Sequence, residues 1–348
     1  MLNFKDLVAC GKVAAKAEKG ASVAFSYEDK NYSGAQVNDL LRSELNELAG
    51  SYADFRENKN TIFKLIEEVV SDVVPNKVKE MYVSMAETKT FGQGEKPIFR
   101  RKVNARTRAK QFITRVGLEG VYEVFKLGGS ESFEVPTSAL GGAAQIGLEE
   151  FLDGRVDFSE LLTIVMEGIE EAIQFEVGKA MIAAINQLPA ANRVSFAGFD
   201  EQEFDRLLFI ADSYGVGKST IYCDFQFASK LMPAEIGMYS EEMKNKLWND
   251  GYFKVYKGHN VVILPNSVED ERNEKLALDP GFAWIMPAGG IDKPVRIAFE
   301  GDTLVDERQN ADWSRDVQVY KKVGVVAMLT NDICVYHDTS LTRDLKKA

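Results

Sequence analysis

The stretch DFSELLTIVMEGIEEAIQFEVGKAMIAAINQL, residues 157–188, carries the strongest periodic pattern in the chain. Its apolar residues recur every three to four positions, which is the spacing of an amphipathic α-helix. They include Leu161, Leu162, Val165, Ile169, Ala172, Ile173, Ala180, Ala183 and Ala184. Asp157 and Glu160 have the spacing of a capping pair, and Pro189 cannot continue the helix. The pattern therefore predicts one structural spine helix over about 158–188, roughly 45 Å long at 1.5 Å per residue.

The front half of this predicted helix, together with the residues before it, is strongly acidic. Arg155 is the only basic residue between positions 143 and 178. The acidic residues that we assign to this surface are Glu149, Glu150, Asp153, Asp157, Glu160, Glu167, Glu170 and Glu171. Consecutive helix positions such as Glu170 and Glu171 point apart, which argues against a catalytic carboxylate pair. A solvated or inter-subunit surface is the favoured interpretation, with an acidic Mg²⁺ or Ca²⁺ site as an alternative.

A basic segment lies upstream, at residues 86–126. Glycines mark its ends, and β-forming residues alternate between them around 112–116 and 121–125, which predicts an extended two-stranded hairpin. No acidic residue stands between Glu95 and Glu119. The basic residues are Lys96, Arg100, Arg101, Lys102, Arg106, Arg108, Lys110 and Arg115. Because such a hairpin is unstable alone, we expect it to lie on an acidic surface. A solvated basic loop and a nucleic-acid arm are the alternatives.

The residues that precede this segment have weaker patterns. We interpret residues 1–60 as an arm that becomes ordered on a partner surface, with SYADFRENKN, residues 51–60, as a linker. A helix is predicted over Thr61–Val74, and Pro75 is expected to end it.

Residues 191–299 alternate helical and strand patterns, which is typical of an α/β unit with its own core. We predict helices over 200–214 and 241–248, and strands over 220–223, 261–264 and 283–286. In the first helix, Phe204, Leu207, Leu208 and Ala211 are predicted to point inward. The chain then returns to β structure: the run Val323–Leu329 is expected to turn at Asn331–Asp332 and to pair with Ile333–Tyr336.

Composition narrows the class of protein. The 348 residues are 45% hydrophobic and 27% charged, as in folded proteins, and the net charge of −11 disfavours non-specific binding to nucleic acid without preventing its enclosure. The three cysteines are far apart, which predicts unpaired, mostly buried thiols. No apolar run has the length of a signal peptide or a membrane span, so we expect assembly in the cytoplasm and no membrane contact.

Catalytic motifs are scarce. GVGKST, Gly215–Thr220, resembles the end of a phosphate-binding loop, but Asp212 stands where the first glycine is required. The segment also follows a predicted helix and precedes a predicted strand, which reverses the context of such a loop. The two histidines, His259 and His337, have no metal-site spacing. We therefore predict no enzyme, no cofactor and no metal.

The order of these elements is similar to that of the major capsid proteins of tailed bacteriophages, the Hong Kong ninety-seven fold. Three segments look like parts of that family: VYKGHNVVILPNSV (255–268), FAWIMPAGGIDKPVRI (282–297) and DWSRDVQVYKKVGVVAMLTNDICVY (312–336). The resemblance implies an α+β fold with an N-terminal arm (1–60) and an extended hairpin, the E-loop (86–126). It also implies a discontinuous P-domain (61–85, 127–190 and 300–348) and an α/β A-domain (191–299).

The implied function is that of a major capsid protein of the virion, which assembles in the host cytoplasm around double-stranded DNA without reading its sequence. The basic hairpin of one subunit would lie over the acidic helix of its neighbour, with Phe99 and Phe112 providing apolar burial. Partners would be further copies in hexamers and pentamers, portal and decoration proteins, and a separate scaffolding protein. The alternatives are an encapsulin-type nanocompartment shell and a cytoplasmic nucleotide-dependent enzyme.

Overall fold

The computed structural model describes residues 3–17, 25–27, 30–102, 130–146, 158–231, 241–268, 276–289, 293–310 and 315–341. Its helices are α1 (Phe4–Ala17), α2 (Gly34–Leu48), α3 (Tyr52–Met81), α6 (Phe158–Ala184), α7 (Glu201–Tyr214), α8 (Phe225–Ala228) and α9 (Glu241–Asp250). Short 3₁₀ turns lie at Ile185–Gln187 and Ala190–Asn192. A small hairpin, β1 (Phe25–Tyr27) and β2 (Lys30–Tyr32), lies between α1 and α2.

Two larger sheets organise the remaining strands. A four-stranded sheet has the order β3-β12-β13-β6, from Ala86–Phe91, Val295–Gln309, Arg315–Ala327 and Ser138–Ile146. A six-stranded sheet has the order β7-β14-β11-β8-β10-β9, from Arg193–Phe196, Cys334–Asp338, Phe282–Met286, Thr220–Cys223, His259–Ile263 and Val255–Tyr256. Strands β4 (Ile98–Lys102) and β5 (Ser130–Glu134) pair as a separate antiparallel ribbon.

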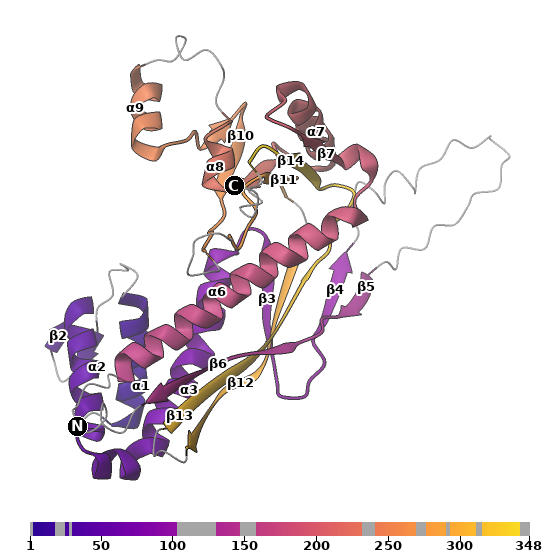
Figure 1. Cartoon of the computed structure of the whole chain (residues 1–348). Helices are drawn as coiled ribbons and strands as arrows, with labels where there is room; N and C mark the ends of the chain where they lie inside the picture. Colours follow the sequence, from indigo (N-terminus) through magenta and orange to yellow (C-terminus); the bar gives the residue numbers. More distant parts are fainter. Residues whose placement is uncertain are drawn as a thin grey trace.

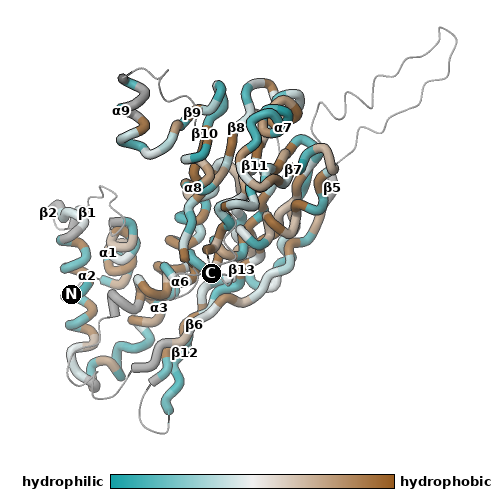
Figure 2. The backbone as a smooth tube through the Cα atoms, turned by 45° about the horizontal axis from the view of Figure 1, so that its top comes forward, coloured by the Kyte–Doolittle hydropathy of each residue, from teal (hydrophilic) through white to brown (hydrophobic). Residues whose placement is uncertain are grey.

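Helix α6 connects the two sheets. It begins at Phe158, and the 3₁₀ turn that follows it carries the chain to the buried Leu188 and to Pro189. In Figure 1 it runs from the N-terminal helices to the base of the six-stranded sheet. One stripe of the helix is buried: Leu162, Met166, Ile169, Ile173, Val177, Met181 and Ala184. Figure 2 shows the accompanying apolar residues along α3, α6 and the strands. A spine of this kind lets two separate sheets share one continuous apolar core.

The N-terminal helices pack on this spine, which corrects the interpretation of residues 1–60 as an arm awaiting a partner. Cys10 on α1 and Val37 on α2 have no exposed surface, and both belong to the same core as α3 and α6. The expected linker at 51–60 is instead the start of α3, capped by Ser51, whose hydroxyl accepts from the backbone N–H of Asp54. Pro75 lies inside α3 rather than at its end, among the buried residues Val73, Val74 and Val78.

The six-stranded sheet matches the local patterns closely. Helix α7 begins after its cap Asp200 and buries the four residues predicted to point inward, Phe204, Leu207, Leu208 and Ala211. They pack on one face of the sheet, against residues of β8, β10, β11 and β14. The opposite face, which carries Tyr222 and Trp284, belongs to the core that includes α6. The sheet is therefore a layer between two helices.

Two expected pairings are wrong. Residues 86–91, expected to begin the hairpin, form β3 and lie parallel to β12 in the four-stranded sheet. Residues 333–336 were expected to return along 323–329, but β13 pairs with β12 and β6 whereas β14 pairs with β11 and β7. The C-terminal strand β14 thus belongs to the six-stranded sheet. From the sequence, all of residues 300–348 were instead expected in the P-domain, separate from the A-domain residues 191–299.

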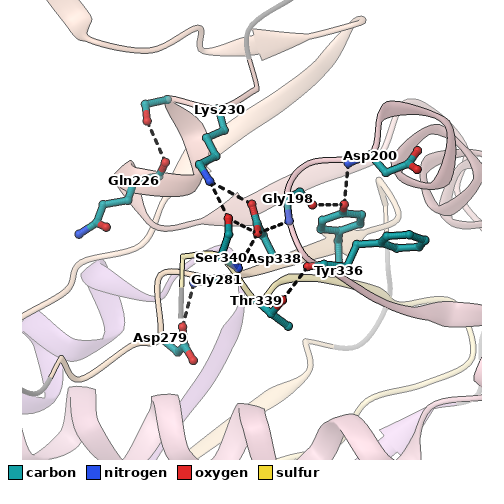
Figure 3. A network of polar contacts seen from close by, with 12 residues as sticks. Gly198, Asp200, Gln226, Lys230, Asp279, Gly281, Tyr336, Asp338, Thr339 and Ser340 are labelled. Atoms are coloured by element: carbon teal, nitrogen blue, oxygen red, sulfur yellow. Dashed lines mark hydrogen bonds and ion pairs between the residues drawn. The ribbon is translucent and has the colours of Figure 1, made fainter. Parts of the chain in front are cut away.

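A polar network holds the end of β14 in place (Figure 3). The carboxylate of Asp338 is fully buried and accepts from the backbone N–H groups of Gly198 and Ser340, both at 2.9 Å, and from Lys230 Nζ at 3.2 Å. Tyr336 Oη accepts from the backbone N–H of Asp200 at 2.7 Å and donates to the carbonyl of Gly198 at 2.9 Å. Because these bonds satisfy the buried carboxylate, the corner between β7 and α7 is fixed to β14.

Candidate functional site

The base of the predicted basic hairpin is the β4–β5 ribbon. Its register runs from Ile98 opposite Glu134 to Lys102 opposite Ser130. The expected strands around 112–116 and 121–125, with Phe112, lie outside the described residues. So do four of the predicted basic residues, Arg106, Arg108, Lys110 and Arg115.

A small apolar cluster fixes this ribbon to the four-stranded sheet. Phe99 has no exposed surface and packs with Val135 and Ala298, while the rings of Phe91 and Phe133 lie 5.7 and 6.4 Å from it. Phe99 was expected to provide burial between subunits. That expectation is wrong, because the side chain is already buried within its own chain. Its role is to anchor the hairpin base.

Glu300 adds a polar clasp at the same junction. Its carboxylate accepts from Thr137 Oγ1 at 2.5 Å, from Lys322 Nζ at 3.1 Å and from the backbone N–H of Gly94 at 3.2 Å. The hydrogen bonds from Thr137 and Lys322 hold the pKa of Glu300 below its ordinary value. The three donors come from the turns on either side of the β4–β5 ribbon and from β13, so one side chain sets how the ribbon leaves the sheet. Sequence patterns gave no signal for this role.

The described basic residues surround the ribbon. Lys96 is exposed and pairs with Glu134 across the ribbon at 3.2 Å. Arg100 is also exposed, whereas Arg101 is only partly so. Lys102 ends β4, at the point where the chain enters the remainder of the hairpin. The described end of β4 therefore carries three consecutive basic residues, Arg100, Arg101 and Lys102.

An apolar groove lies between α6 and strand β6. It has a volume of about 320 Å³, and its lining is largely apolar. The lining residues are Leu140, Gly141, Gly142, Ala143, Ile164, Val165, Gly168, Ile169, Ala172, Val317 and Val319. Ile164 is 59% exposed. Among the described strands, β6 pairs only with β13, so its other edge offers unpaired backbone groups beside the groove.

The predicted acidic residues of α6 divide at this groove. Glu167 and Glu171 are exposed and stand three residues after the groove residues Ile164 and Gly168, which places them on its rim. Glu170 is buried and forms an ion pair with Lys77 of α3 at 3.1 Å, so its assignment to an inter-subunit surface is wrong. Glu160 lies in the first turn of α6, where the structure describes the backbone but not this side chain. Glu149, Glu150, Asp153 and Asp157 lie outside the described residues.

The segment Gly215–Thr220 has the context that argues against a phosphate-binding loop. It follows α7 and precedes β8. Asp212 accepts from the backbone N–H of Ser219 at 2.7 Å and lies 3.6 Å from Lys218 Nζ. Burial alone would raise the pKa of Asp212, but the hydrogen bonds from Ser219 keep the pKa below its ordinary value. The carboxylate of Asp212 would repel phosphate oxygens, and Lys218 already forms an ion pair with it.

The other reactive groups are buried. All three thiols are unpaired and buried, as predicted, and burial raises the pKa of Cys10 to about 11 and that of Cys334 to about 12. Within the described residues, no group of three His, Cys, Asp or Glu side chains is arranged to hold a metal ion. No described helix is long and apolar enough to cross a membrane.

A protein-family model matches most of the chain. The model of the family described as "SPbeta prophage-derived putative capsid protein YonB" matches residues 5–333. No curated protein matches the chain.

Several solved structures are similar in arrangement. The virus-like particle of Pyrococcus furiosus is 15% identical, with a TM-score of 0.44, over 79% of this chain and 99% of that one. A Microbacterium phage Oxtober96 chain is 8% identical, with a TM-score of 0.46, over 73% and 90%. The SrpI encapsulin of Synechococcus elongatus PCC 7942 is 12% identical, with a TM-score of 0.43, over 76% and 89%. These TM-scores lie below 0.5, so the family match alone assigns the chain.

Proposed function

Because the chain belongs to this family of prophage-derived capsid proteins, we propose that it is the major shell subunit and that its α6–β6 groove receives the basic hairpin of a neighbouring copy. Copies joined in this way form an icosahedral shell that encloses double-stranded DNA in the virion, after assembly in the host cytoplasm. The role is structural rather than catalytic. The observation that carries the proposal is the apolar groove with two exposed glutamates on its rim.

The chemistry of the groove suits the hairpin. The eight basic residues between Lys96 and Arg115 are complementary in charge to Glu167 and Glu171, which favours rapid, oriented encounter. Phe112, Ile113 and Val116 of the hairpin supply apolar side chains for the groove. The open edge of β6 supports addition of an extended segment as a further strand.

The two halves of the contact differ, which supports assembly into a shell. A hairpin on one copy and a groove on the next make a heterologous contact, and repetition of such a contact closes rings when the rotation permits. The hairpin must leave its own subunit at a defined angle for closure. Phe99 and Glu300, which fix the ribbon to the four-stranded sheet, are suited to set that angle.

The net charge of the chain supports enclosure of DNA. A chain with a net charge of −11 resists sticking to the DNA that it encloses, so packaging needs no sequence-specific contact. A portal, decoration proteins and a separate scaffolding protein complete the proposal.

Charge reversal tests the contact. We expect the variant Glu167→Arg/Glu171→Arg to stay folded and to form no shells in electron micrographs, since like charges then meet across the groove. Glu57→Arg/Glu68→Arg changes two exposed glutamates on α3 by the same charge and serves as the control. Addition of Arg106→Glu/Arg108→Glu to the blocked variant should restore assembly. Normal shells from the Glu167/Glu171 variant would refute the groove as the receiving site.

Filling the groove is a test that does not involve charge. Gly168 lines the groove, and nothing lies within 4 Å of the Cβ that it lacks. We expect Gly168→Leu to fold and to lose assembly, while Gly168→Ala assembles.

The shell role itself has a separate test in electron micrographs of the wild type. Discrete monomers under every condition, including with a candidate scaffold, would refute it. Shells that contain protein cargo instead of DNA would identify a nanocompartment.

A further inference from the structure

The contact between the two long helices α3 and α6 contains a buried ion pair. Lys77 Nζ on α3 lies 3.1 Å from a carboxylate oxygen of Glu170 on α6. The side chain of Glu170 is 2% exposed, and that of Lys77 is 15% exposed. A buried pair adds little net stability, because taking both charges out of water offsets most of their attraction. The pair is therefore better explained by what it specifies about the structure.

The residues four positions away from the pair, one turn along each helix, carry no charge. On α3 these are Val73 and Met81, and on α6 they are Met166 and Gln174. A slide of α6 along α3 by one turn, about 5.4 Å, would leave the buried lysine and glutamate beside uncharged side chains. Separation of a buried ion pair is strongly unfavourable. The pair thus selects one register of the two helices, as one buried polar residue does in a coiled coil.

Helix α3 is itself fixed to the four-stranded sheet by polar contacts with β12. Ser71 Oγ accepts from the backbone N–H of Thr303 at 2.8 Å and donates to Thr303 Oγ1 at 3.0 Å. One turn earlier, Glu67 Oε1 accepts from the backbone N–H of Val305 at 2.9 Å. These bonds set the position of α3 along the sheet. The ion pair then sets the position of α6 along α3, so the register of the sheet is passed on to α6.

We infer that Lys77 and Glu170 are positioning residues for the α6–β6 groove, because they set the register of the helix that forms one of its walls. The inference rests on the proposed shell function and deepens it. The opposite wall belongs to β6 and β13. A one-turn slide of α6 would therefore move Gly168, Glu167 and Glu171 by about 5.4 Å relative to that wall. The ion pair does not line the groove and acts on it only through the helix.

An exchange of two residues on α6 tests the register directly. Glu170→Gln/Gln174→Glu preserves the composition and net charge of the chain, leaves the groove and its rim unchanged, and moves the carboxylate by one turn. We expect this variant to fold, since Lys77 regains a partner when α6 slides, and to form no uniform shells in electron micrographs. Folding is checked by circular dichroism and a cooperative urea transition. Shells of wild-type diameter from the folded variant would overturn the inference.

A second pair of variants separates register from stability and does not depend on the folding of the first. Lys77→Met/Glu170→Met replaces both charges by apolar side chains of similar length, a change that is often neutral or stabilising. We expect its urea midpoint to equal or exceed that of the wild type, while the protein concentration needed for shell assembly rises at least tenfold. The reversed pair, Lys77→Glu/Glu170→Lys, regains the attraction and should assemble as the wild type does.

The matched control is an exposed ion pair between α1 and α3, in which Lys12 lies 2.9 Å from Asp72. Lys12→Gln/Asp72→Asn should leave assembly unchanged. Wild-type assembly of Lys77→Met/Glu170→Met, or a fall in its urea midpoint in step with lost assembly, would overturn the positioning role while the shell role stands. Failure of the wild type to form shells under any condition would instead refute the shell role, on which this inference rests.

Discussion

The two large sheets are assembled in contrasting ways. Five strands of the six-stranded sheet come from residues 193–286, and only β14 arrives from far along the chain. The four-stranded sheet joins β3, β6, β12 and β13, and its first pairing links Ala86 to Val295. The first sheet is largely a product of neighbouring segments, whereas the second depends on contacts between distant ones. We therefore expect the hairpin and groove, which are built on the second sheet, to be the more sensitive to single substitutions.

The largest expected effect is at the hairpin base. Phe99→Ala removes the largest side chain of the buried cluster that joins the β4–β5 ribbon to the four-stranded sheet. This change should lower the free energy of unfolding by about 3–4 kcal/mol. Hydrogen exchange should accelerate in β4 and β5 before it does in the six-stranded sheet. Ile98→Ala, at the exposed neighbouring position, should cost less than about 0.5 kcal/mol. Equal acceleration in both sheets would contradict the contrast drawn above.

The next effect is where α6 supports the six-stranded sheet. A Cβ at Gly178 would lie 2.3 Å from the carbonyl oxygen of Ala277, which precedes β11. Gly178→Val should lower the free energy of unfolding by about 2–3 kcal/mol, measured by urea denaturation. On the same helix, Gly168→Ala meets no atom within 4 Å and should stabilise the subunit by about 0.5–1 kcal/mol. A destabilised Gly168→Ala would undermine this comparison.

A smaller effect is expected at the joint between the sheets. Asn192 is buried, and its side-chain amide donates to the carbonyls of Asn331 at 2.7 Å and Ile333 at 3.0 Å. These bonds tie the entry to β7 to the crossing from β13 to β14. Asn192→Ala should cost about 1–2 kcal/mol and broaden the calorimetric transition, because the two sheets then unfold less cooperatively. Asn186→Ala, at an exposed position nearby, should leave the transition sharp.

The smallest effect is a pH dependence at the clasp. Since the pKa of Glu300 is lower in the folded protein, its contribution is complete above the ordinary glutamate pKa of about 4.3 and is lost as the pH falls through the folded value. Glu300→Gln should be less stable than the wild type at pH 7. The difference in urea midpoint between the two proteins should shrink on acidification below about pH 4. A difference that stays constant over this range would show that Glu300 does not act as a carboxylate clasp.

The candidate site was predicted only in part. Glu167 and Glu171 belong to the predicted acidic pattern and are exposed, three positions after the groove residues Ile164 and Gly168, but Glu170 belongs to the same pattern and is buried against Lys77. The periodicity of residues 157–188 does not say which side of the helix a second helix will cover. The groove itself depends on β6, whose glycines and alanines carry almost no signal in sequence.

The sequence by itself determined the elements whose pattern is local. The long helix, α7 with its four inward residues, the strand at 220–223 and the unpaired cysteines all follow from spacing and residue type. Only the tertiary structure decided that 86–91 joins β12, that β14 joins the six-stranded sheet, and that the N-terminal helices pack on α3. Spacing reports which side of an element is apolar. It cannot report which distant surface will cover that side, because that depends on contacts that form only when the whole chain has folded.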